Sequence, residues 1–149
     1  MIVRRLMLAA AVIGGGCGGS PITAPRLERA IAPTFANLLH LQVPAMGLAA
    51  MSPSEFAPAA SCRKVGASGA AATHTGSGDW ICTIQWRGPG QMPLRDVYDL
   101  FVTTDGCYTA TVEGESLARP VLTTKDGREV RNLLYVFEGC FDTSPHRTE

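Results

Sequence analysis

Four widely spaced cysteines constrain the fold of this chain more than any other feature of its sequence. An even number of separated cysteines in an exported domain predicts a framework of two disulfides. Four cysteines allow three connectivities, and the sequence alone does not choose among them. We favour bonds between neighbours in the sequence, because these close the shorter loops. The favoured pairs are Cys62–Cys82 and Cys107–Cys140.

A zinc site is the alternative use of these cysteines. Structural zinc sites need short Cys-x2-4-Cys or His-x3-5-His spacings, and the chain has neither. We therefore expect no metal and no cofactor.

The first sixteen residues carry the pattern of an export signal. Arg4 and Arg5 form a positive start, Leu6 to Ile13 form a short apolar stretch, and Gly14 to Gly16 supply the small residues that a signal peptidase accepts. The glycines would break a structural helix at this place. Residues 1–16 are therefore predicted to be a signal peptide.

Cys17 directly follows the small residues and resembles the lipobox cysteine of bacterial lipoproteins. That resemblance implies a lipid anchor on Cys17 after cleavage, although Gly14 stands where the family usually has leucine. The run Gly18 to Pro21 looks like the flexible tether that follows such a cysteine, so residues 17–25 are expected to be lipidated cysteine and tether. Ordinary secretion is the alternative.

Composition excludes several classes of protein. Thirteen Lys and Arg balance thirteen Asp and Glu in 149 residues, which gives no basic footprint for a nucleic acid. Hydrophobic residues make up 46%, enough for a buried core. No segment approaches the roughly 20 apolar residues of a membrane-spanning helix.

Residues 26–42 show helical periodicity after the predicted tether. Pro33 interrupts the pattern, so we expect either a kink there or a helix that begins with Pro33 in its first turn. Phe35 and Leu39 flank the apolar side, and His40 lies on the polar side. The predicted apolar stripe consists of Leu27, Ala30, Ile31, Thr34, Leu38 and Leu41.

The period changes to two from Asp79 onward, which predicts strands. Residues 43–61 and 63–78 are rich in small residues, proline or glycine and are predicted to be mainly loops. The expected strands span residues 80–86, 97–104, 107–113 and 133–137, with a hairpin between 121 and 130. The predicted fold is α+β: one domain over 26–142, with an N-terminal amphipathic helix on four to five antiparallel strands, and a tail over 143–149.

The order of these motifs resembles small lipoproteins of actinobacteria and related high-GC bacteria. The resemblance rests on the lipobox, the helix start at Leu27 to Ala32, Ser61-Cys62, Trp80 to Thr83, and Asp105 to Tyr108. It implies one helix before a disulfide-tied antiparallel sheet and a place in the cell envelope. It implies no reaction.

The residues suited to chemistry are scattered. None of the serines lies in a Gly-x-Ser-x-Gly elbow, and the three histidines are far apart in the sequence. We expect a non-enzymatic binding domain for an envelope protein, a peptide or a cell-wall component. Trp86 beside Arg87-Gly88-Pro89-Gly90 is the candidate binding residue, and the alternative for this ring is a place in the core, where most aromatic rings of the strands are expected. The alternative is a small hydrolase with a site near His74 and Asp79.

Overall fold

The computed structural model describes residues 21–66, 75–114 and 117–143. One long helix, α1 (Ala24–Ala45), precedes all the strands. A short 3-10 turn, η1 (Pro89–Gln91), lies between the second and third strands. The strands are β1 (Ala59–Lys64), β2 (Gly78–Arg87), β3 (Pro93–Val102), β4 (Cys107–Glu113), β5 (Val121–Thr123), β6 (Glu129–Arg131) and β7 (Val136–Cys140).

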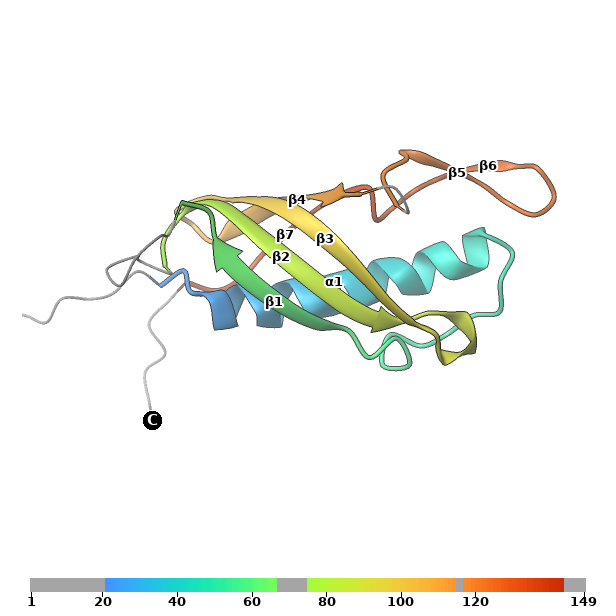
Figure 1. Cartoon of the computed structure of the whole chain (residues 1–149), viewed down its shortest axis with the longest axis horizontal. Helices are drawn as coiled ribbons and strands as arrows, with labels where there is room; N and C mark the ends of the chain where they lie inside the picture. Colours follow the sequence, from blue (N-terminus) through green and yellow to red (C-terminus); the bar gives the residue numbers. More distant parts are fainter. Residues whose placement is uncertain (1–20, 67–74, 115–116, 144–149) are drawn as a thin grey trace, which may run out of the picture.

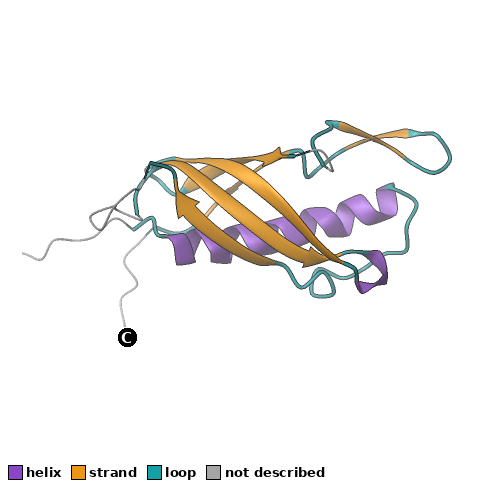
Figure 2. Cartoon of the chain, in the orientation of Figure 1, coloured by secondary structure: helices purple, strands orange, loops and turns teal. Residues whose placement is uncertain are grey.

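Five of the strands form one antiparallel sheet in the order β1-β2-β3-β4-β7. The strands cross α1 diagonally and cover one side of it (Figure 1). β5 and β6 pair only with each other and form a separate two-stranded arm beyond the end of the sheet (Figure 2). The predicted α+β fold, with one helix on an antiparallel sheet, is confirmed.

The core lies between α1 and the inner face of the sheet. Side chains alternate between the two faces of a strand, and the predicted aromatic face of β2 is the inner one. Phe35 of α1 packs edge-on against Tyr98 of β3, with ring centroids 6.0 Å apart. Tyr98 in turn contacts Phe137 of β7, with ring centroids 5.3 Å apart, so the aromatic packing extends from α1 across β3 to the β7 edge. The fully buried large side chains include Leu27, Ile31, Phe35, Phe56, Trp80, Ile84, Tyr98, Val102 and Leu134.

The helix does not begin at Pro33. It runs from Ala24 to Ala45 with Pro33 inside it. Pro33 is exposed, so the amide that proline lacks is missing on the solvent side of the helix. The next residue, Thr34, donates a 2.9 Å hydrogen bond from its hydroxyl to the carbonyl of Ala30 within the same helix.

The apolar stripe predicted for the helix was partly wrong. Leu41 is 60% exposed, whereas Phe35 and Leu39, predicted to flank the stripe, are buried with Val43. The buried positions Leu27, Ile31, Phe35, Leu39 and Val43 recur every four residues. Four residues advance about 40° beyond a full helical turn, so this stripe winds around the helix axis. The diagonal strands follow it.

The segments predicted as loops contain an edge strand. β1 pairs with β2 over six residues, from Ala59 opposite Gln85 to Lys64 opposite Trp80. The prediction that residues 63–78 form a loop was therefore wrong at both ends, because Lys64 closes β1 and Gly78 opens β2. The last strand is also shifted, to Val136–Cys140 from the predicted 133–137.

Both favoured disulfides are present. Cys62–Cys82 joins β1 to β2, and Cys107–Cys140 joins β4 to β7. In each case the two cysteines are directly opposite partners in neighbouring antiparallel strands. Each disulfide therefore ties one edge strand of the five-stranded sheet to its neighbour. Two disulfides in a small domain indicate an oxidising compartment outside the cytosol.

Candidate functional site

A tight turn closes the end of the hairpin between β2 and β3, next to Trp86. The amide of Gly88 donates a 2.8 Å hydrogen bond to the carbonyl of Met92, and the amide of Gln91 donates one of 3.0 Å to the carbonyl of Gly88. Gly88 is buried, and a Cβ there would meet Leu94 at 2.7 Å. A side chain at position 88 would therefore displace the end of the Leu94 side chain on the strand that returns.

Trp86 is held from several sides at this end of the sheet. Its indole nitrogen donates a 2.7 Å hydrogen bond to a carboxylate oxygen of Asp96. Its ring lies edge-on to Phe35 and Phe56, with centroids 5.7 and 6.5 Å away. The ring is half-buried, so part of it packs in the core and part meets solvent. Such a ring presents a fixed apolar surface at low entropic cost.

Asp96 is an uncommon core residue, because it is only 5% exposed and lies on the inner face of β3. Its charge and the burial of Tyr98 together raise the pKa of the Tyr98 hydroxyl far above its usual value, with burial the larger cause. That hydroxyl donates to the carbonyl of Leu134 at 3.0 Å. The hydrogen bond to the indole thus links the position of Trp86 to a buried polar group in the core.

The exposed part of Trp86 lines a surface hollow of about 530 Å³. Arg87 at the end of β2 and Arg95 of β3 line the same hollow, and both are exposed. Among the described residues, neither arginine forms an ion pair with a carboxylate. The hollow therefore combines an apolar ring with two guanidinium groups that retain their donors. Its other lining residues are Ala57, Ala59, Gln85, Pro93 and Leu94.

Backbone strain gathers around this hollow. Ala57, which lines it, has a φ of 42°, and Gln91 in η1 has a φ of 63°. Residues other than glycine seldom adopt positive φ, and such residues often mark binding or catalytic sites. In the described part of the chain, these two are the non-glycine residues with positive φ.

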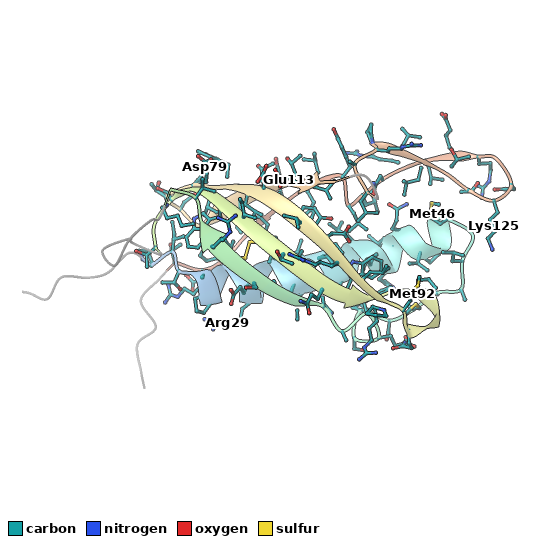
Figure 3. The ribbon with its side chains drawn as sticks, in the orientation of Figure 1. Arg29, Met46, Asp79, Met92, Glu113 and Lys125 are labelled. Atoms are coloured by element: carbon teal, nitrogen blue, oxygen red, sulfur yellow. A yellow bond between two sulfur atoms is a disulfide. The ribbon has the colours of Figure 1, made fainter. Side chains whose placement is uncertain are left out.

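The residues proposed for a hydrolase lie elsewhere. His74 is outside the described residues, and Asp79 is exposed at the start of β2. Figure 3 shows Asp79 and Met92, in the segment between β2 and β3, at opposite ends of the sheet. Asp79 and Trp86 are seven residues apart on one strand, which is about 23 Å. The two candidate sites are therefore separate, and the hydrolase alternative stays a prediction.

The outer face of the sheet holds a carboxyl pair that sequence reasoning did not assemble. Glu113 of β4 hydrogen-bonds to Asp99 of β3, and this bond and the charge of Asp99 raise the pKa of Glu113, while Arg63 opposes the rise. Asp96 on the same strand does not join this pair, because strand alternation puts Asp96 and Asp99 on opposite faces. Both carboxyl groups are exposed, and Asp99 also lines a surface hollow of about 410 Å³.

Cys17, His40 and the expected absence of a metal site are the predictions that lie away from the hollow. Cys17, with the signal and the tether up to residue 20, lies outside the described residues, so lipidation stays a prediction. The rest of the predicted tether, up to residue 25, was wrong, because Ile22 is 2% exposed and α1 already begins at Ala24. His40 is exposed on α1, and its Nδ1 lies 2.8 Å from the carbonyl of Met51. The described residues contain no group of three His, Cys, Asp or Glu side chains arranged to hold a metal ion. No helix among them combines the length and hydropathy needed to cross a membrane.

No protein-family model, curated protein or solved structure matches this chain.

Proposed function

We propose that this chain is an exported, lipid-anchored domain of the cell envelope that binds a protein, peptide or cell-wall partner without chemical turnover. The observation that carries the proposal is the hollow at the hairpin where β2 ends and β3 begins. There Trp86 is fixed by Asp96 and flanked by Arg87 and Arg95. Aromatic and arginine side chains are the residues most enriched among those that dominate binding energy in interfaces.

The placement of the hollow supports an anchored binder. The helix begins at Ala24, seven residues after Cys17, and the hairpin end lies at the opposite end of the domain (Figure 1). A helix of 22 residues is about 33 Å long. A lipid on Cys17 would hold the N-terminal end of α1 near the membrane and leave the hollow facing away from it. The partner is then a component of the envelope space and not the anchoring membrane.

The binding part of the proposal is tested by crosslinking in living cells. A photo-reactive p-benzoylphenylalanine at position Gln85 in the hollow should give a product of defined mass. The same group at position Asn37, exposed on α1, is the matched control. Absence of a product from position 85, or an identical product from position 37, would contradict a binding site in the hollow.

Reversing a charge in the hollow tests whether the crosslink depends on its arginines. Arg95→Glu should reduce the crosslink about tenfold or more, because a buried or partly buried charged contact contributes more than 1.4 kcal/mol. Lys125→Glu changes the net charge by the same amount at the exposed turn between β5 and β6, and it should leave the crosslink unchanged. Equal losses of the crosslink in both variants would indicate a general charge effect and would contradict a binding site in the hollow.

The anchoring part is tested separately with Cys17→Ser. We expect the protein to move from the membrane fraction to the medium, or to remain unprocessed, because acyl chains supply about 0.8 kcal/mol per buried methylene. Unchanged mass and unchanged membrane fractionation would show that Cys17 carries no lipid. That outcome would not affect the crosslinking result.

A further inference from the structure

The disulfide between β4 and β7 is open to solvent, unlike the disulfide between β1 and β2. Cys140 is exposed and Cys107 is half-buried, whereas Cys82 is fully buried and Cys62 is 9% exposed. The reason is strand alternation: Cys62–Cys82 lies on the inner face, against α1, and Cys107–Cys140 lies on the outer face. A thiol can therefore approach one of the two bonds without unfolding the domain.

The open disulfide lines a hollow of about 290 Å³ with an exposed aromatic ring. Phe101 of β3 is 57% exposed and lines this hollow together with both cysteines. Glu138, two residues before Cys140, contributes a negative charge there. A large exposed ring beside a disulfide offers an apolar contact for an incoming protein.

A second hollow, of about 390 Å³, has two arginines and one of the two cysteines in its lining. It is lined by Cys140 and Phe141 and by Arg26 and Arg29 of the first turns of α1, with Asp142 also on its wall. Arginine side chains near a cysteine stabilise the thiolate form, which is the form that takes part in exchange. The guanidinium of Arg26 also donates to the carbonyl of Pro21 at 3.0 Å, so Arg29 is the freer of the two.

We propose that Cys107–Cys140 is a thiol–disulfide exchange site that reacts with the dithiol of an envelope oxidoreductase. A thiolate of the partner attacks the sulfur of Cys107, a mixed disulfide forms, and the Cys107–Cys140 bond breaks. The electron pair leaves on the sulfur of Cys140, in the hollow that the two arginines line, and this thiolate then takes a proton from water. The partner's second thiol, deprotonated, then attacks the partner's own sulfur in the mixed disulfide, releases Cys107 as a thiol and leaves the partner oxidised. Two electrons pass from the partner to this chain.

The fold can tolerate the reduced state. Phe137 of β7 stays packed on Tyr98, and Cys62–Cys82 continues to close the opposite edge of the sheet. Reduction therefore removes the covalent tie on β7 while its apolar contact with the core remains. This inference does not depend on the binding function proposed above.

Timed reduction of the oxidised, processed protein tests the proposal, with the second disulfide as an internal control. The native protein is treated with dithiothreitol, quenched with iodoacetamide and mapped by mass spectrometry. We expect Cys107 and Cys140 to be alkylated at least tenfold faster than Cys62 and Cys82, with the far-UV circular dichroism unchanged. Equal rates for the two bonds, or loss of structure in step with alkylation, would overturn the proposal.

Two substitutions then test the surroundings of the bond. Arg29→Gln should slow reduction by dithiothreitol severalfold, whereas Arg63→Gln, an exposed arginine of β1, should not. Phe101→Ala should slow reduction by a thioredoxin-type dithiol protein and leave the rate with dithiothreitol unchanged, because only a protein uses the apolar contact. If Arg29→Gln leaves the rate unaltered, or Phe101→Ala affects both reductants equally, the assigned site is wrong.

Discussion

A disulfide ties each edge strand of the five-stranded sheet to its neighbour, and the two disulfides lie on opposite faces of the sheet. At the β1 edge, Cys62–Cys82 lies inside the core, and at the β7 edge, Cys107–Cys140 lies on the outer surface. Both bonds join positions that do not exchange backbone hydrogen bonds. Hydrogen-bonded and non-bonded pairs alternate along an antiparallel ladder, and the bonded pairs Val65–Asp79 and Gly106–Phe141 lie three positions and one position away. The side chains approach most closely at such positions, so the backbone favours a disulfide equally at both edges.

The difference lies in what surrounds each bond. The carboxylate of Glu28 accepts a 2.8 Å hydrogen bond from the amide of Cys62, so the helix also secures the β1 edge. At the β7 edge the described residues supply no such partner for the amides of Glu138 or Cys140. The comparison shows that identical covalent chemistry can be structural at one edge and accessible at the other, with burial as the deciding variable.

Removal of the buried disulfide should have the largest effect. Cys62→Ala with Cys82→Ala is expected to lower the free energy of unfolding by about 4–5 kcal/mol. Opening a loop of 20 residues accounts for about 3 kcal/mol, and lost packing in the core accounts for the rest. Urea denaturation of the double variant measures the change. A loss below about 2 kcal/mol would mean that burial adds nothing to this bond.

Removal of the exposed disulfide should cost less, although its loop is longer. For Cys107→Ala with Cys140→Ala we expect a loss of about 3–4 kcal/mol, which is the chain-entropy contribution of a loop with a separation of 33 residues. No packing loss is added, because Cys140 is exposed. The same urea experiment ranks the two double variants. A reversed ranking would show that loop length, and not burial, distinguishes the two edges.

The next largest effect concerns Glu28, which helps to hold the β1 edge. Glu28→Leu should lower the free energy of unfolding by about 1–2 kcal/mol, because the amide of Cys62 loses its acceptor in a part-buried position. Glu28→Gln keeps an acceptor oxygen and should lose much less. Hydrogen exchange at the amide of Cys62 provides the local readout. Unchanged protection in Glu28→Leu would argue that the disulfide alone secures this edge.

The smallest effect is expected on the outer face, at Glu113. The folded protein raises the pKa of Glu113, chiefly through Asp99, so its charged form is disfavoured and stability falls as the pH rises through that pKa. Glu113→Gln should therefore raise the Tm at pH 7 by at most about 2 °C and leave it unchanged at pH 3, where the carboxyl is protonated in both states. Thermal scans at the two pH values are sufficient. A gain of equal size at pH 3 would assign the effect to packing instead of charge.

Strands with local periodicity were predictable from the sequence. Alternation from Trp80 to Trp86 identified β2 and its inner face, and Asp105-Gly106 identified the turn into β4, where Gly106 has a φ of 85°. The residues that make up each of these patterns lie within a few positions of one another, so the patterns can be recognised without knowledge of the fold. The hairpin of β5 and β6 was found in the same way.

The features that depend on distant contacts were missed. β1 buries one cysteine among six residues, so it shows no alternation, and only its pairing with β2 makes it a strand. The buried stripe of α1 follows the diagonal path of the sheet, which no helical wheel contains. Gln42 is a polar residue of α1 that is only 4% exposed. Its Oε1 accepts a 2.7 Å hydrogen bond from the amide of Leu133, which is 91 residues away in the sequence, so its burial depends on a distant contact.

The candidate site was predictable only in part, for the same reason. Trp86 was identified from its place before Arg87-Gly88-Pro89-Gly90. Arg95 and Asp96 were not joined to it, because their proximity depends on the register that sets Gln85 opposite Arg95 and Ile84 opposite Asp96. Register is fixed by the whole sheet and its turns, and a single strand does not reveal it.

The outward amides of β7 have a consequence for assembly. An edge strand whose backbone donors face solvent is a template for a further strand, and a guest chain pairing there would extend the sheet to six strands. At the β1 edge, by contrast, the outward amide of Cys62 already donates to the carboxylate of Glu28. The shortness of β7, five residues, and the charge of Glu138 limit the partners that fit. A further strand would therefore meet open backbone donors at the β7 edge and a carboxylate of α1 at the β1 edge.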